Sequence, residues 1–130
     1  MPTKVLSYKY LALIYALLIF AISAIPELTP PSFGFKIEDK ILHFLEYSVF
    51  SFLLFLAFFT SGKEFLKKHV FLISSLIGIA YALTDELHQK FVPGRSCDFF
   101  DFLADCLGII AIQIGIWFYF KRKENRLTAP

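Results

Sequence analysis

The chain has 130 residues, of which 57% are hydrophobic, 18% aromatic and only 18% charged, and its mean hydropathy is +0.63. Soluble domains average about 25% charged residues. The composition therefore argues against a soluble enzyme, a disordered chain and a nucleic-acid-binding domain, and the length allows one domain. It indicates a multi-pass membrane protein.

Four apolar runs follow one another along the chain. A bilayer core about 30 Å thick needs about 20 helical residues, and each run reaches or approaches that length with its flanks. Backbone groups in lipid must be hydrogen-bonded within the protein, and the alternation typical of a membrane barrel is absent. We predict an all-α, four-transmembrane-helix bundle that forms one domain over 1–130. The expected helices cover about 8–25, 40–60, 69–88 and 98–120.

The breaks between the runs carry turn and stop signals. Pro26 and Pro30 follow the first run, and proline cannot continue a helix interior. Ser61-Gly62-Lys63 closes the second run, and Pro93-Gly94 predicts a turn before the last one. The charged tail from Lys121 onward is expected to be frayed.

The first run has a second interpretation, as a secretory signal peptide. Lys4 and Lys9 precede it, and small side chains such as Ser23 stand near its end. The run is long for the apolar part of a signal, so we favour a retained helix.

Basic residues are distributed unequally between the two sides of the predicted bundle. With four spans, both termini and the 61–69 loop lie on one side, which holds nine Lys and Arg against two acids. The other side holds four basic and nine acidic residues. Cytoplasmic loops are enriched in Lys and Arg, so we expect both termini in the cytoplasm. The basic side would meet anionic membrane lipids, and no basic stripe points to nucleic acid.

Acidic side chains continue from the outer loops into the predicted helices. Two sets each share one helical face: Asp39, His43 and Glu46 on the second helix, and Asp98, Asp101 and Asp105 on the fourth. Ionisable groups inside a membrane usually face the bundle interior or a wet cavity. The third predicted helix ends in the polar residues Asp85, Glu86, His88 and Gln89. We therefore expect three helices to line one outward-facing polar pocket.

Each of these residues also has a structural interpretation. Asp39 and Asp98 suit helix N-caps. The deeper acids could pair with Lys40 and Arg95, and His43 could be a buried, hydrogen-bonded histidine.

The spacing of the polar residues carries a family resemblance over about residues 8–120. The motifs are Asp39-Lys40-x-x-His43-Phe44-x-x-Tyr47, Asp85-Glu86-x-x-Gln89, Phe91-x-Pro93-Gly94-Arg95 and Asp101-x-x-Ala104-Asp105-x-x-Gly108. They resemble the VanZ-like family of bacterial membrane proteins, which often has Asn at the position of Asp105. Glu46 and His88 stand at variable positions of that pattern. The family takes its name from a factor associated with low-level teicoplanin resistance. Teicoplanin is a lipoglycopeptide that acts at the outer face of the plasma membrane. The resemblance therefore implies a role at the cell envelope, in the bacterial plasma membrane.

Three functions remain open on the sequence. The first is binding of an envelope lipid, an envelope lipid precursor or a lipoglycopeptide, as in antibiotic resistance. The residues expected to bind are Asp39, Lys40, Tyr47, Asp85, Gln89, Arg95 and Asp105. The second is an enzyme acting on a phosphate-bearing lipid headgroup, with His43, Glu86 and Asp101 as catalytic candidates. A divalent metal could assist the enzyme, with Asp85, Glu86, Asp101 and Asp105 as possible ligands, although no established metal motif is present.

Transport is a third possibility, since buried acids can carry protons or cations. Four short helices without inverted repeats are a poor transporter alone. Gly78 and Gly108 permit close helix contact, either within one bundle or in an oligomer. Cys97 and Cys106 could form a disulfide in an oxidising compartment. If both lie on one continuous helix, nine residues separate them by about 13.5 Å, which is too far for a bridge, so we favour free thiols.

Overall fold

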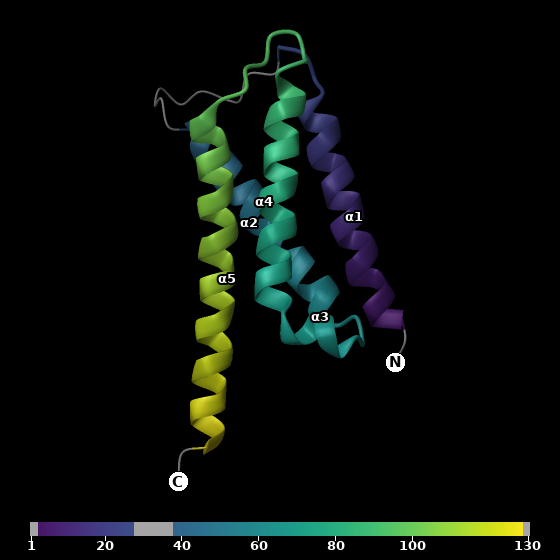
Figure 1. Cartoon of the computed structure of the whole chain (residues 1–130), viewed down its shortest axis with the longest axis vertical. Coiled ribbons are helices and arrows are strands. Elements are labelled where there is room, and N and C mark those ends of the chain that lie inside the picture. The colour runs from purple at the N-terminus through teal and green to yellow at the C-terminus, as the bar shows by residue number, and fades with distance from the viewer. Residues whose placement is uncertain (1–2, 28–37, 129–130) are drawn as a thin grey trace.

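The computed structural model describes residues 3–27 and 38–128, and its regular structure over those residues is entirely helical (Figure 1). The helices are α1 (Thr3–Ser23), α2 (Glu38–Phe59), α3 (Glu64–Lys68), α4 (Val70–Gln89) and α5 (Phe99–Thr128). The four long helices lie side by side as a bundle, with α2 behind α4 and α5 in this view. The expected all-α bundle is confirmed.

Three of the helices have the length and composition of membrane spans. These are α2, α4 and α5, whereas the described apolar part of α1, Tyr8–Ser23, is shorter. Many large apolar side chains point outward from the bundle, among them Leu13 and Leu17 of α1, each more than half exposed. Such a surface suits contact with lipid. The fourth span stays a prediction.

Three details differ from the sequence prediction. The first helix begins at Thr3, five residues before the expected start near residue 8. We expected the last helix to end near residue 120 with a frayed tail, and this is wrong, because α5 continues to Thr128. Hydropathy reports where the apolar stretch ends, but Lys, Arg and Glu in the tail are good helix formers and sustain the helical hydrogen bonds. The short helix α3 was not predicted; it follows the turn at Gly62, whose φ is +74°.

One face of α2 forms the centre of the core. Its buried residues recur every three or four positions: Tyr47, Phe50, Leu54 and Ala57. This spacing produces one apolar stripe along a helix. The stripe belongs to the same core cluster as Ile19 of α1, Ala82 of α4 and Ile109 of α5. The bundle is therefore built around α2.

The helices α2 and α5 approach each other closely at Gly108. A Cβ atom at this position would collide with the Phe44 carbonyl oxygen and would lie 2.9 Å from Ser48 Oγ. Ser48 Oγ also donates a hydrogen bond of 3.1 Å to the Gly108 carbonyl oxygen. Small residues let membrane helices pack this tightly. Gly108 serves packing within the bundle, which fixes how the polar faces of α2 and α5 meet.

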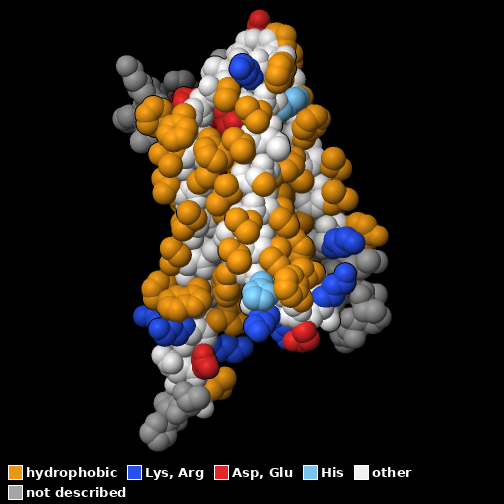
Figure 2. All heavy atoms as spheres, in the orientation of Figure 1, with side chains coloured by type: hydrophobic (Ala, Val, Ile, Leu, Met, Phe, Trp, Pro, Cys, Tyr) orange, Lys and Arg blue, Asp and Glu red, His pale blue; other side chains and the backbone are white. Residues whose placement is uncertain are grey.

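Charged side chains gather at the two ends of the molecule and leave an apolar middle (Figure 2). Most of the Lys and Arg visible on this face lie at the lower end, where α1 begins and α5 ends. Acidic side chains are seen at the upper end, near the loop between α4 and α5. The charge asymmetry read from the sequence is thus an asymmetry of the folded bundle.

Candidate functional site

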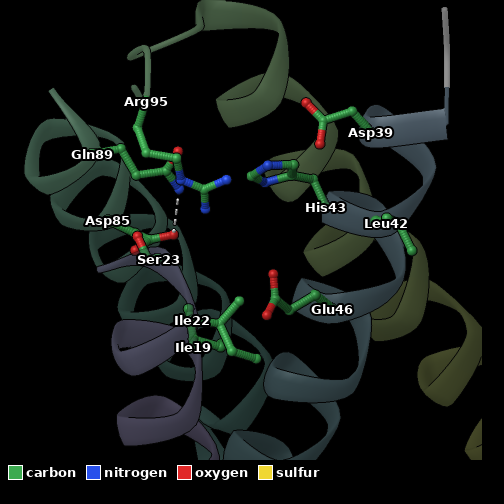
Figure 3. A pocket seen from close by; sticks show the side chains of 10 residues that line it. All are labelled: Ile19, Ile22, Ser23, Asp39, Leu42, His43, Glu46, Asp85, Gln89 and Arg95. Carbon is green, nitrogen blue, oxygen red and sulfur yellow. Dashed lines mark hydrogen bonds between the residues drawn. The ribbon is translucent and has the colours of Figure 1, made fainter. Parts of the chain in front are cut away.

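A small polar cavity opens at the acidic end, among the upper turns of α1, α2 and α4 and the loop that follows α4 (Figure 3). Its volume is about 100 Å³. The lining residues are Ile19, Ile22, Ser23, Asp39, Leu42, His43, Glu46, Asp85, Gln89 and Arg95. A water molecule occupies about 30 Å³ of liquid, so the cavity suits a few waters or one small polar group.

The cavity wall presents polar atoms that lack a partner. Asp85 is 5% exposed and Ser23 3% exposed. Among the described residues, Asp85 Oδ1 and Ser23 Oγ are buried without a hydrogen-bond partner. Burying such a group unpaired costs about 1–3 kcal/mol. Both atoms can accept a hydrogen bond from a group inside the cavity.

Asp85 is held in place from two sides. The hydroxyl of Tyr47 donates to Asp85 Oδ2 at 3.3 Å, and the Gln89 amide donates to the same oxygen at 3.4 Å. Tyr47 has no exposed surface and does not line the cavity. It positions Asp85, whose other oxygen remains available.

Lys40 is bound to acidic residues at the start of α5. Its Nζ donates to Asp98 Oδ2 at 2.9 Å and also to Asp101 Oδ1. Asp98 in addition caps α5, since its Oδ1 accepts the Phe100 N–H at 2.8 Å. These hydrogen bonds favour the carboxylate and hold the pKa of Asp98 below its usual value. Asp98 therefore serves both as the N-cap of α5 and as a partner of Lys40.

Asp39 differs from the expected N-cap. It lies inside the first turn of α2, whose first residue is Glu38. Its carboxylate is 3.9 Å from Lys40 Nζ and lines the cavity. Residue 37, which precedes the helix, is outside the described residues.

His43 lies between the cavity and α5. Its Nδ1 is 3.0 Å from Asp105 Oδ1, and its Nε2 is 4.0 Å from Asp101 Oδ2. Asp105 is fully buried, so this contact fixes the orientation of the imidazole ring. A carboxylate that orients a histidine is a common part of general-base and metal sites.

Glu86 lies behind the cavity, with 2% of its surface exposed. Its Oε2 accepts the backbone N–H of Asp98 at 3.0 Å, which ties α4 to the start of α5. A nitrogen of His43 and one carboxylate oxygen each of Glu86 and Asp105 all lie within 4.8 Å of one another. A second group of this kind consists of Asp39, His43 and Asp101.

The structure divides the expected site residues into two groups. Those that line the cavity are Asp39, His43, Asp85, Gln89 and Arg95. Those that lie outside its lining are Lys40, Tyr47, Glu86, Asp101 and Asp105. The second group contacts the first: Asp105 holds His43, and Tyr47 holds Asp85.

Two polar lining residues were absent from the expected set. Glu46 points into the cavity (Figure 3); its spacing from Asp39 and His43 placed it on the right face, but it stands outside the family motif. Ser23 comes from α1, where the sequence showed only a small residue near a helix end. No ionisable group signals that α1 forms part of the wall.

The cavity as a whole favours a positively charged occupant. The acids Asp39, Glu46 and Asp85 line it, while Arg95 is the only Lys or Arg among its described lining residues. Lys40, the other basic residue of the expected site, is already bound to Asp98 and Asp101. The arrangement can therefore accept an amine or a metal cation.

Comparison with known proteins gives one result. The model of the VanZ/LLP1 family matches residues 7–121. No curated protein and no solved structure matches the chain. The matched range includes every cavity-lining residue and every motif identified in the sequence.

Proposed function

Because the chain belongs to the VanZ/LLP1 family of membrane proteins, we propose that it acts at the outer face of a bacterial plasma membrane, where its polar cavity binds the headgroup of an envelope lipid, a lipid precursor or a lipoglycopeptide. The observation that carries this proposal is the pair of unpartnered acceptors in the wall, Asp85 Oδ1 and Ser23 Oγ. They and Glu46 suit a group that donates several hydrogen bonds, as an ammonium does.

The charge asymmetry supports the orientation. Lys63, Lys67 and Lys68 near α3 and the basic end of α5 lie at the end opposite the cavity. Excess Lys and Arg marks the cytoplasmic side. The cavity would then open toward the cell exterior, with both termini in the cytoplasm.

The size of the cavity limits what it holds. About 100 Å³ accommodates an amine or a comparable group, and the rest of an amphiphile must stay outside. The exposed apolar side chains Ile22 and Leu42 stand at the rim and suit contact with an acyl chain. An aminophospholipid fits this pattern, with its ammonium on the acids of the cavity wall.

Competition between two lipids in nanodiscs tests the proposal. We would embed the protein in equal parts of phosphatidylethanolamine and phosphatidylglycerol and identify the retained lipid by native mass spectrometry. A parallel sample would contain a lipoglycopeptide. We expect preferential retention of the amine-bearing lipid or the lipoglycopeptide, and at least tenfold loss in Glu46→Gln, equivalent to about 1.4 kcal/mol.

The matched control is Glu64→Gln, the same change at an exposed residue of α3. It should retain the lipid as the unchanged protein does. Equal retention of both lipids, or equal loss in the two variants, would refute the proposal.

A second candidate function is hydrolysis or transfer of a phosphate-bearing headgroup. It is favoured by the 3.0 Å contact between His43 Nδ1 and Asp105 Oδ1, which would let His43 act as a general base through Nε2. Product formation from such a lipid, lost in both His43→Ala and Arg95→Ala, would establish it. Binding without product would leave the first proposal standing.

A further inference from the structure

Three ionisable side chains meet behind the cavity, at the junction of α2, α4 and α5. They are His43, Glu86 and Asp105, with donor atoms within 4.8 Å of one another. Glu86 is 2% exposed and Asp105 has no exposed surface. The binding of a headgroup in the cavity does not explain this group, because neither acid lines the cavity.

Two carboxylate oxygens in this group have no partner. Among the described residues, Glu86 Oε1 and Asp105 Oδ2 are buried without a hydrogen bond, although the other oxygen of each acid has one. An unpaired buried charge is strongly unfavourable unless a cation compensates it. His43 contacts Asp105, and Lys40 is bound elsewhere, to Asp98 and Asp101. The cluster thus has free oxygen ligands and an excess of negative charge.

We propose that His43, Glu86 and Asp105 bind a divalent transition-metal ion of the Zn²⁺ type. One imidazole nitrogen and two carboxylate oxygens form a ligand set that Zn²⁺ accepts, at bond lengths of about 2.0–2.2 Å. The unpartnered Glu86 Oε1 and Asp105 Oδ2 can supply the oxygens, and a metal bound between His43 and Asp105 would replace their present 3.0 Å contact. Tetrahedral ligands are about 3.4 Å apart at these bond lengths, and the candidate ligand atoms lie within 4.8 Å of one another, so the side chains must move closer to hold the ion.

The competing group, Asp39, His43 and Asp101, is less suited to a cation. Asp101 already forms an ion pair with Lys40, and Asp39 lies 3.9 Å from the same ammonium. A metal there would stand beside a fixed positive charge, which repels it. The group of Glu86 and Asp105 is therefore the stronger site.

The inference goes beyond headgroup binding and does not depend on it. Three protein ligands leave a coordination position for water or for an atom of a bound molecule. His43 belongs both to this group and to the cavity wall. A metal at this site would therefore connect the buried cluster with whatever the cavity holds.

Metal titration of the purified protein in nanodiscs tests the site. The protein would be stripped with a chelator, titrated with Zn²⁺ alone, freed of unbound metal and analysed for metal content. We expect one equivalent in the unchanged protein and at least tenfold weaker binding in Asp105→Asn and in Glu86→Gln. Co²⁺ in place of Zn²⁺ should give visible d–d absorption that both variants lose.

Glu46→Gln is the matched control, because it removes a nearby carboxylate that belongs to neither metal group. It should keep the full metal content while it loses lipid retention, so the two proposals fail separately. Circular dichroism identifies any variant that does not fold. If Asp105→Asn or Glu86→Gln fails to fold, the metal content of the other one tests the site. Zn²⁺ absent from the folded unchanged protein, or bound equally by Asp105→Asn, Glu86→Gln and the control, would overturn the inference.

Discussion

Substitution of Gly108 by Ala should separate α2 from α5 and destabilise the bundle. The added Cβ atom would overlap the Phe44 carbonyl oxygen and lie 2.9 Å from Ser48 Oγ and 3.0 Å from the Phe44 carbonyl carbon. Two of these neighbours are backbone atoms of α2 and cannot rotate away. The helices themselves must move apart, which also stretches the hydrogen bond of 3.1 Å from Ser48 Oγ to the Gly108 carbonyl oxygen.

The magnitude follows from two opposing effects. Insertion of a methyl group into a close-packed contact costs about 1–3 kcal/mol, and the rigid backbone neighbours place Gly108 at the upper end of that range. Ala favours the helical conformation over Gly by about 0.5–1 kcal/mol. We therefore expect Gly108→Ala to lower the free energy of unfolding by about 2 kcal/mol.

Gly115 provides the matched control on the same helix. A Cβ atom there would meet nothing within 4 Å, so Gly115→Ala should be neutral or stabilising by about 0.5–1 kcal/mol. Reversible unfolding in mixed detergent micelles would compare the two variants with the unchanged protein. Equal free energies for Gly108→Ala and Gly115→Ala would refute the close contact between α2 and α5.

Two further changes test the polar cluster. Tyr47→Phe removes the hydrogen bond to Asp85 Oδ2 and should cost about 1 kcal/mol in unfolding free energy; no loss in detergent unfolding would argue against that bond. Lys40→Met leaves Asp98 and Asp101 without their ammonium and should cost about 2 kcal/mol. Because the folded-state pKa of Asp98 lies below its ordinary 3.8, ionised Asp98 stabilises the protein above that pH. The stabilisation is lost as the pH falls through the lowered pKa. A pH series of melting temperatures should show a smaller acid-induced drop in Lys40→Met, and an unchanged drop would contradict the ion pair.

The sequence predicts the faces of the helices better than the contacts between them. The spacing of Asp39, His43 and Glu46 puts all three on the cavity side of α2, because helical periodicity fixes which residues share a face. The same periodicity leaves open how far one helix slides or turns against the next. The sequence therefore could not tell that Asp105 contacts His43 more closely than Asp101 does.

Composition also predicted the ends of some helices and not of others. Apolar runs located α2 and α4 to within about two residues, because lipid-facing and core positions in these spans are both apolar. They failed at the end of α5, where charged residues continue the helix beyond the apolar stretch. They also gave no sign that Ser23 closes the cavity from α1, since a serine hydroxyl acquires that role only through the packing of its helix.

The central claim, that the cavity faces the cell exterior, is tested most directly by labelling Cys97. This thiol is exposed between α4 and α5, at the cavity end of the bundle. We would remove the second thiol with Cys106→Ala and treat intact spheroplasts with a membrane-impermeant maleimide. A control protein would carry Cys97→Ala, Cys106→Ala and Glu64→Cys, which places its thiol at the basic end. We predict that Cys97 reacts in intact spheroplasts and that the Glu64→Cys protein reacts only after lysis. The reverse pattern would place the cavity in the cytoplasm and contradict a role at the outer face of the membrane.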